Sequence, residues 1–286
     1  MSQTLTLVVH TGGIGDFLLA CPALERLAKE GPVELLGKPE RLALAVAGGI
    51  AVAAHDIESS GFESVFTEPA PRLRAFLARY DRCIVWMRDG GSIAEAIHRC
   101  GVAVVRAFAG LPPEGYDRHA SRYYAECLGY TEIDAPFGLA VEASGTHDVI
   151  IHPGSGSRGK NWPLEHFIAV ADGLAAENRR VTWCLGPAEG HLRLPASFET
   201  VPSPALVDVA HVLAGTRLFL GNDSGIAHLA ASVGCPTVAV FGPSNAAVWA
   251  PRGPYVEVVQ GRPWPAIADV LNAACRLWDT RPRSAT

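Results

Sequence analysis

One stretch of the chain combines glycines, hydroxyl side chains and positive charge in the pattern that binds phosphate. Residues 154–160 read GSGSRGK and follow the apolar run at 148–153. Such a loop gathers backbone N–H groups with the hydroxyls of Ser155 and Ser157, and Arg158 and Lys160 add positive charge. It therefore predicts an anion cradle at the end of a strand. The alternative is a surface loop with incidental basic residues.

A second stretch, GNDSGIAH at 221–228, also follows an apolar run. Asp223 or Asn222 is placed to cap the next helix. Ser224 and Gly225 then present backbone N–H groups in its first turn, where the helix dipole favours phosphate. His228 follows one turn later. The alternative is an ordinary capped helix with a packed histidine.

Two weaker signals lie in the same half of the chain. Glu189, in WCLGPAEGH at 183–191, could accept hydrogen bonds from ribose hydroxyls, although an exposed loop acid is the commoner case. The letters GSGSRG at 154–159 also match the glycine fingerprint of dinucleotide-binding enzymes. In that fingerprint the helix opens within the glycines, whereas here residues 160–163 intervene. A dinucleotide-dependent oxidoreductase therefore ranks low.

An acid follows a glycine turn near the start of the chain. Gly12, Gly13 and Gly15 follow the apolar run Leu5–Val9, and Asp16 comes directly after them. A carboxylate here would repel a phosphate at close range. It could instead take a proton from a hydroxyl, or cap a helix that starts at Phe17, and both roles are compatible.

Short apolar runs alternate with helical patterns along the chain, which predicts parallel sheets covered by helices. The alternation restarts near residue 148, which predicts two units in tandem, 1–143 and 144–263. The last helix could pack on either of them. Predicted strands are 5–10, 33–37, 82–87, 102–108, 148–154, 180–186, 217–222 and 237–242; predicted helices are 17–30, 39–47, 92–100, 118–128, 163–177, 206–214, 224–233 and 264–279.

Composition limits the function classes. The 286 residues are 49% hydrophobic and carry a net charge of −5, which argues against an extensive nucleic-acid-binding surface. The seven cysteines are scattered and form no C-x-x-C pair, so buried free thiols in the cytoplasm are predicted. Neither a signal peptide nor a membrane helix is predicted, because the start lacks a charged segment and no apolar run is long enough. Its histidines have no metal-ligand spacing, so no metal site is predicted.

The motifs at 12–16, 152–167 and 218–244, in this order and spacing, resemble glycosyltransferase family 9, the bacterial ADP-heptose:lipopolysaccharide heptosyltransferases. The resemblance spans the chain and implies an α/β GT-B fold, with two Rossmann-like parallel-sheet domains facing across a cleft. The N-terminal domain would bind the acceptor and the C-terminal domain the nucleotide sugar. The C-terminal helix, within 264–286, would pack back on the first domain.

The same resemblance implies roles for individual residues. Asp16 matches the catalytic base of an inverting, metal-independent sugar transfer, and Gly12, Gly13 and Gly15 form its acceptor-side loop. Adenine contacts would lie near Pro204–Leu206. Residues that match the nucleotide-sugar site are Ser155, Ser157, Lys160, Glu189, Asp223, Ser224, Gly225 and His228.

The acceptor stays open at this stage. The first 145 residues hold 13 basic and 18 acidic side chains, and only 72–88 looks locally cationic, whereas a phosphorylated lipid acceptor favours a basic groove. The partners expected are a nucleotide sugar and a glycan or glycolipid, with contact at the inner membrane and the oligomeric state open. The alternatives are a non-catalytic nucleotide-sugar-binding protein, or a transferase with another nucleotide sugar and a small-molecule acceptor.

Overall fold

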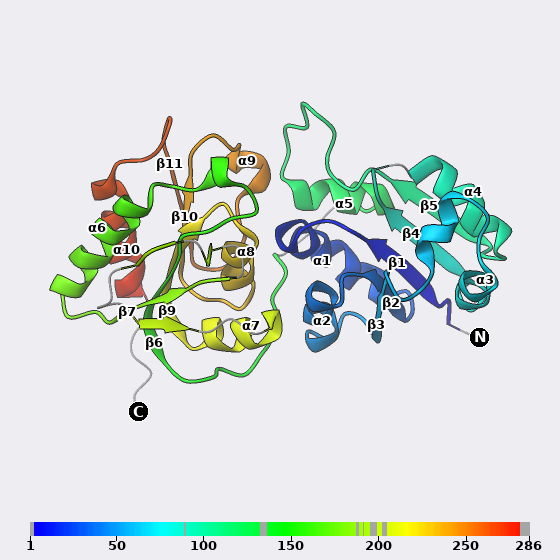
Figure 1. The fold of residues 1–286 in the computed structure, drawn as a ribbon, viewed down its shortest axis with the longest axis horizontal. Coiled ribbons are helices and arrows are strands. Elements are labelled where there is room, and N and C mark those ends of the chain that lie inside the picture. Colours follow the sequence, from blue (N-terminus) through cyan, green and yellow to red (C-terminus); the bar gives the residue numbers. More distant parts are fainter. Residues whose placement is uncertain are drawn as a thin grey trace. The chain divides into compact units, whose positions relative to one another are not determined.

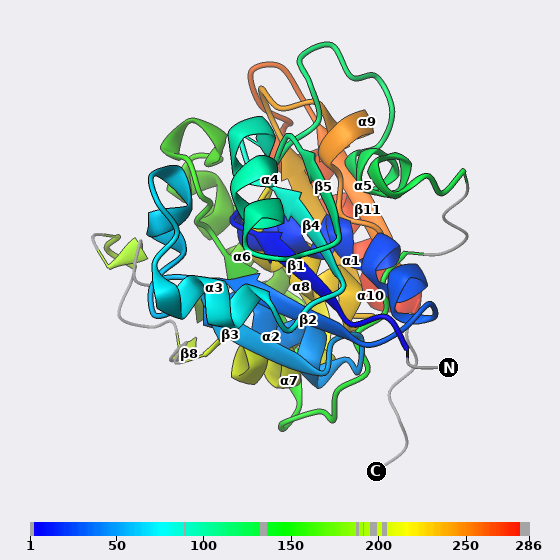
Figure 2. The same ribbon diagram turned by 90° about the vertical axis from the view of Figure 1, so that its right-hand side faces the viewer.

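A computed structural model describes residues 3–88, 90–131, 136–186, 189–190, 192–194, 199–201 and 205–280. The chain forms two compact units, which divide between residues 135 and 136. The boundary that the sequence suggested lies eight residues later, in the segment that leads to the second sheet. Each unit contains one parallel sheet with helices on both faces (Figures 1 and 2).

The first unit is built around a central strand that is buried along its whole length. Strand β1 (Thr6–His10) pairs in parallel with β2 and β4, and the sheet order is β3-β2-β1-β4-β5. A strand covered on both faces needs a continuous apolar sequence, which Leu7, Val8 and Val9 supply at its centre. The other elements are α1 (Ile14–Ala28), β2 (Val33–Gly37), α2 (Pro39–Ala47), β3 (Ala53–Asp56), η1 (Phe62–Phe66), α3 (Pro71–Leu77), β4 (Arg82–Trp86), α4 (Gly90–Arg99), β5 (Val104–Phe108) and α5 (Ala120–Leu128).

The second unit repeats this plan, with the sheet order β11-β10-β9-β6-β7-β8. Helices α6 and α10 pack on one face of the sheet, and α7 and α8 on the other (Figure 1). Its elements are β6 (His147–His152), η2 (Arg158–Lys160), α6 (Leu164–Ala176), β7 (Val181–Cys184), β8 (Glu199–Val201), α7 (Leu206–Ala214), β9 (Thr216–Asn222), α8 (Gly225–Ser232), β10 (Thr237–Phe241), α9 (Ala246–Trp249), β11 (Val256–Gln260) and α10 (Ile267–Thr280).

The last helix, α10, is anchored within the second unit. It packs on α6 and on strands β9 to β11. The buried Trp278 contacts two cations, with the guanidinium carbons of Arg217 and Arg179 at 3.8 and 4.9 Å from the ring centroid. Such cation–π contacts add to the apolar burial of the helix. Residues 281–286, the end of the predicted C-terminal segment, lie outside the described residues.

The strand orders place the functional loops. In each sheet the chain leaves the first strand in one direction and later returns to build outward on its other side. The order therefore reverses between β1 and β4, and between β6 and β9. Open parallel sheets bind ligands beyond the carboxyl ends of the strands at such a switch point. The motifs at 12–16, 154–160 and 223–225 all follow strands that border a switch point.

The predicted strands and helices are confirmed, each end falling within three residues of its predicted position. Short elements with weak patterns were missed, namely β3, α3, β8, α9, β11 and the 3₁₀ helices η1 and η2. All seven cysteines are free thiols, and six of them are buried. No described helix is long and apolar enough to cross a membrane.

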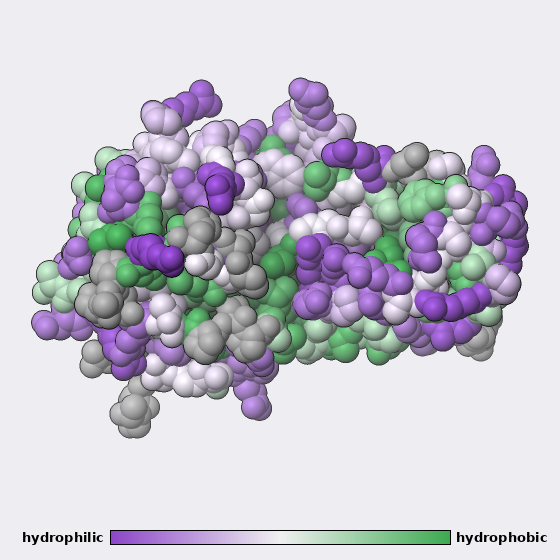
Figure 3. All heavy atoms as spheres, viewed as in Figure 1, coloured by the Kyte–Doolittle hydropathy of each residue, from purple (hydrophilic) through white to green (hydrophobic). Residues whose placement is uncertain are grey.

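The arginines at 72–88 do not form a free basic groove. Arg74 pairs with Glu68, Arg79 with Glu34, and Arg82 with Glu30. Hydrophilic and hydrophobic residues are interspersed over the face of each unit that Figure 3 shows. The local cationic character of the sequence is therefore largely offset by neighbouring acids.

Candidate functional site

The loop after β1 is tightly packed around Asp16. Helix α1 begins at Ile14, not at Phe17 as the sequence suggested, so Asp16 lies in its first turn. The Asp16 Oδ2 atom accepts a hydrogen bond from the Gly13 N–H at 2.8 Å. The carboxylate thus caps α1 from within, while Oδ1 has no partner among the described residues. The predicted start of the helix was three residues late because glycines are typical of loops, whereas Gly15 here is part of α1.

Gly12 is required by its neighbours. A Cβ atom at this position would lie 2.8 Å from His10 Cε1 and 3.0 Å from Asp16 Cβ. The guanidinium of Arg41, on α2, donates a hydrogen bond to the Gly12 carbonyl. The His10 imidazole and the Asp16 carboxylate therefore both lie against the backbone at Gly12, and Arg41 binds the carbonyl of the same residue. Sequence reasoning missed His10 and Arg41; a histidine that ends a buried central strand was the only available signal.

His10 is a neutral imidazole in an aromatic environment. Its ring packs against Phe17, Trp86 and Tyr124 with centroid distances of 5.3, 6.2 and 6.0 Å. Burial, assisted by the charge of Arg41, lowers the pKa of His10 to about 3. The Nε2 atom is buried without a hydrogen-bond partner in the described part of the chain. The His10 side chain, which packs against the loop after β1, is therefore uncharged near neutral pH.

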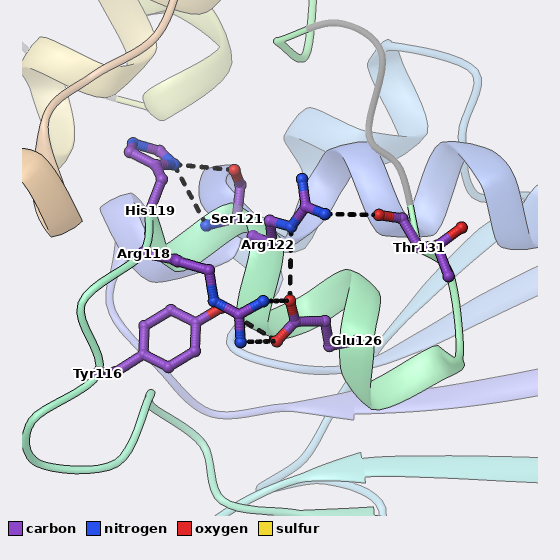
Figure 4. Close-up of polar contacts among 7 residues, drawn as sticks. All are labelled: Tyr116, Arg118, His119, Ser121, Arg122, Glu126 and Thr131. Atoms are coloured by element: carbon purple, nitrogen blue, oxygen red, sulfur yellow. Dashed lines mark hydrogen bonds and ion pairs between the residues drawn. The ribbon is translucent and has the colours of Figure 1, made fainter.

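Another loop at the carboxyl edge of this sheet is fixed by Glu126 of α5 (Figure 4). Arg118 donates to both carboxylate oxygens of Glu126 at 2.6 and 3.1 Å, and the Tyr116 hydroxyl donates at 3.2 Å. Arg122 lies 3.5 Å from the same carboxylate, and His119 caps α5 by accepting from the Ser121 N–H. One acid thus orders the segment that leads from β5 into α5, and it offsets two cations.

In the second unit, the loops after β6 and β9 meet at an ion pair. The loop at 153–163, here the β6 loop, carries Lys160, whose Nζ lies 2.8 Å from Oδ2 of Asp223. Asp223 is buried, whereas the lysine side chain is 40% exposed. An ammonium group has three N–H donors, so two remain available for an anion.

A neighbouring amide fixes the β6 loop to β9. Asn222 accepts the Trp162 N–H at 2.9 Å and donates to the Pro153 carbonyl at 2.7 Å. Asn222 is fully buried, and so is the indole of Trp162. Both ends of the β6 loop are therefore held by one side chain, a role that the sequence did not reveal.

The residue that caps α8 is Ser224, not Asp223 or Asn222 as predicted. Its Oγ accepts the Ala227 N–H at 3.3 Å, while Asp223 and Asn222 are engaged by the β6 loop. The N–H groups of Gly225 and Ile226 are in the first turn, where no intrahelical partner exists. They follow Asp223, the partner of Lys160, by two and three positions in the chain. His228 is buried on the same helix.

The other predicted residues divide into two kinds. Ser155 Oγ lies 2.7 Å from the Ser157 carbonyl and 2.6 Å from Asn161 Oδ1, so Ser155 braces the loop, whereas Ser157 is exposed. Glu189 is buried, and its Oε2 accepts the Gly186 N–H at 2.8 Å. The remainder of that carboxylate lies over Gly154, where a Cβ atom would overlap it. The structure thus brings Glu189 to the β6 loop.

Buried groups surround Glu189. His152 ends β6, and its Nδ1 lies 2.9 Å from the Cys184 carbonyl at the end of β7. Burial lowers the pKa of His152. Burial, with the charge of Glu189, raises the pKa of the Cys184 thiol to about 11. Both side chains are therefore uncharged near neutral pH.

The second unit contains two cavities. One of about 240 Å³ is lined by Ile150, Cys184, Val201 and residues of α7 between 208 and 213, and it is mostly apolar. The other, of about 270 Å³, lies beside Gly159 and the loops after β10 and β11. Within the described ranges, no group of three or more His, Cys, Asp or Glu side chains is placed to hold a metal ion. Helix α6 opens only at Leu164, so the glycines at 154–159 do not form the helix turn of a dinucleotide site.

Comparison with known proteins identifies a family. A model described as glycosyltransferase family 9 (heptosyltransferase) matches residues 102–271. Lipopolysaccharide heptosyltransferase 1 of Escherichia coli K12 is 28% identical over 137 residues, 43% of each chain. That of Pseudomonas aeruginosa PAO1 is 35% identical over 92 residues, 30% of this chain and 26% of its own. The chain thus aligns with less than half the length of these curated relatives.

Solved structures share the fold. A glycosyl transferase family 9 protein from Veillonella parvula superposes with a TM-score of 0.79 at 17% identity, covering 98% of this chain and 99% of its own. The E. coli ADP-heptose lps heptosyltransferase II gives a TM-score of 0.77 at 17% identity, covering 96% and 98%. At this identity the likeness shows the GT-B fold.

The contact between Gly154 and Glu189 predicts a contrast between two glycines of one loop. Gly154→Ala should lower the free energy of unfolding by about 1–3 kcal/mol, because the new methyl group displaces a buried carboxylate. Gly156→Ala is the matched control, since a Cβ there meets no atom within 4 Å. Denaturant unfolding measures both. Equal effects would show that Glu189 does not occupy this place.

The buried His10 predicts a pH dependence of stability. Its pKa is lower in the folded than in the unfolded chain, so the unfolded chain binds the proton first as the pH falls. Stability should be full above about pH 6.5 and decline below it. His10→Phe keeps an aromatic ring but cannot titrate, so its stability should decline less between pH 7 and 5. An identical decline in denaturant titrations of both proteins would contradict this assignment.

Proposed function

Because the chain belongs to glycosyltransferase family 9, we propose that it transfers a sugar from a nucleoside diphosphate sugar to a hydroxyl group. The donor proposed is ADP-heptose, and the acceptor is a glycan or a lipopolysaccharide-type glycolipid. The observation that supports this most directly is the Lys160–Asp223 pair beside the first turn of α8. A cation and a helix N-terminus at a switch point form a site for a diphosphate.

Two kinds of group would bind the diphosphate, the Lys160 ammonium and backbone N–H groups at the start of α8. The free donors of Lys160 would contact phosphate oxygens, and the N–H groups of Gly225 and Ile226 would add the positive end of the α8 dipole. Asp223 does not repel the ligand outright, because its charge is paired with Lys160. The same groups would stabilise the nucleoside diphosphate as it leaves. This supplies the positive charge that the step needs, so we propose that transfer is metal-independent.

The nucleoside would extend toward β7 and α7. The buried carboxylate of Glu189, beside the β6 loop, would accept hydrogen bonds from the ribose hydroxyls. The apolar cavity of about 240 Å³ at Cys184, Val201 and α7 would receive the flat base. Its lining residues on α7 begin at Asp208, two positions after Leu206, near which adenine contacts were predicted; Pro204 is outside the described residues.

Asp16 would act as the general base. Its Oδ2 is held by the Gly13 N–H, which leaves Oδ1 to accept the acceptor's hydroxyl proton. As that proton moves to Asp16, the acceptor oxygen bonds to the anomeric carbon. The bond from that carbon to the phosphate oxygen breaks on the opposite face, and the configuration inverts. The nucleoside diphosphate departs with the bonding electron pair.

The test separates binding from proton transfer. Asp16→Asn should lower kcat by about 100-fold or more, the range for a general base, with the affinity for ADP within twofold of wild type. Lys160→Ala should weaken ADP binding at least tenfold. Calorimetry with ADP and a transfer assay with ADP-heptose and lipopolysaccharide acceptor fragments measure these effects.

Matched controls are Glu40→Gln, in the first turn of α2, and Lys38→Ala, a surface lysine paired with Glu58. Both should match wild type. An Asp16→Asn protein with full kcat would refute the base, and unchanged ADP affinity of Lys160→Ala would refute the diphosphate site. Nucleotide-sugar binding without transfer to any acceptor would favour the non-catalytic alternative.

A further inference from the structure

Arg41 belongs to the first turn of α2, at the carboxyl edge of the first sheet. Strand β2, which leads into α2, pairs with β1 so that Gly37 lies opposite His10. A Cβ atom on Gly37 would overlap the His10 carbonyl oxygen and lie 3.3 Å from Leu42 Cδ1. The missing side chain therefore lets α2 start close to the end of β1, and it brings Arg41 to the loop that follows this strand.

One peptide group connects this arginine to Asp16. The Arg41 guanidinium donates a hydrogen bond to the Gly12 carbonyl. The Gly13 N–H donates to Asp16 Oδ2 at 2.8 Å. The carbonyl of Gly12 and the N–H of Gly13 are the two ends of the same planar peptide group. The cation and the carboxylate therefore bind opposite ends of one amide dipole, and each holds it in the orientation that the other requires.

The orientation of this peptide group depends on these two hydrogen bonds. Glycine stands on both sides of it, so neither flanking residue has a side chain that limits its rotation. If the group turned over, its carbonyl would face the Asp16 carboxylate, and Oδ2 would lose its donor. Arg41 opposes this rotation, because the carbonyl oxygen would have to leave a charged donor.

The charge of Arg41 adds to the effect of its hydrogen bond. A cation at the carbonyl end polarises an amide and makes its N–H a stronger donor. The same charge assists burial in lowering the pKa of His10, whose ring lies against Gly12. Arg41 also stands in the first turn of a helix, where the macrodipole disfavours a cation. The arginine is therefore stabilised by the loop after β1 rather than by its own helix.

We infer that Arg41 is a positioning residue for proton transfer to Asp16, and that it acts through the peptide group between Gly12 and Gly13. By holding the Gly13 N–H on Oδ2, it fixes the carboxylate so that Oδ1 is left for the acceptor hydroxyl. The arginine itself contacts neither the sugar nor the reacting atoms. This inference rests on the proposed function, because it requires Asp16 to be the general base.

The test measures kcat, and KM for the acceptor, in the transfer assay with ADP-heptose and lipopolysaccharide acceptor fragments. Arg41→Ala should lower kcat by about 10- to 100-fold, the range for losing a charge-assisted hydrogen bond, with KM unchanged. Arg41→Lys keeps a charged donor and should retain more of kcat. Hydrogen exchange at the Gly13 amide should be faster in Arg41→Ala than in wild type, because this N–H is no longer held on Oδ2.

A double variant separates positioning from general damage to the fold. In the Asp16→Asn protein, Arg41→Ala should lower the residual kcat no further, because the carboxylate on which the arginine acts is gone. Arg74→Ala is the matched control and should match wild type. Arg74 also donates to a backbone carbonyl, that of Pro69, but it does so from α3.

The outcomes separate this inference from the proposed function. Full kcat in Arg41→Ala, or an equal loss with and without the Asp16 carboxylate, would overturn the positioning role while the general base stands. A higher KM with unchanged kcat would overturn it too, because Arg41 would then bind the acceptor directly. Full kcat in Asp16→Asn, or no transfer by the wild-type protein, would refute the proposed function and this inference with it.

Discussion

The internal architecture of each unit depends on one topological constraint, the reversal of strand order next to the first strand of its sheet. Because the chain builds outward from β1 and from β6 in both directions, the loops on either side of each reversal diverge. The crevice between them is where a parallel sheet exposes backbone N–H groups and helix N-termini. Asp16 in the first unit and Lys160 in the second each follow a strand that borders such a reversal.

The two switch points have opposite chemical character. The β1 loop presents a carboxylate above a neutral imidazole, and the cation beside it, Arg41, is engaged with a backbone carbonyl. The β6 loop presents an ammonium group beside a helix N-terminus, and its acid is buried in an ion pair. One arrangement suits removal of a proton and the other suits a departing anion. This division of labour is what a displacement at an anomeric carbon would require.

The sequence predicted the parallel architecture and the positions of the glycine loops, because buried strands and tight turns leave local patterns. It did not predict which polar side chain caps α8. Asp223 is a good cap in isolation, but a lysine 63 positions away engages it, and Ser224 takes the role. The bracing by Asn222 and the packing of His10 under Gly12 depend equally on partners distant in sequence. The residue roles at the two loops stay predictions.

The central claim is that the switch point of the second unit is a nucleoside diphosphate site. It is tested most directly by the thermal unfolding midpoint of the wild-type protein with ADP, UDP, GDP, dTDP and NAD, each with and without Mg²⁺. A ligand at 100 times its Kd stabilises the folded state by about 2.7 kcal/mol, a readily measured shift. The account predicts stabilisation by ADP above all, with the same shift in the presence and absence of Mg²⁺. A response to NAD alone, or to none of the nucleotides, would contradict it.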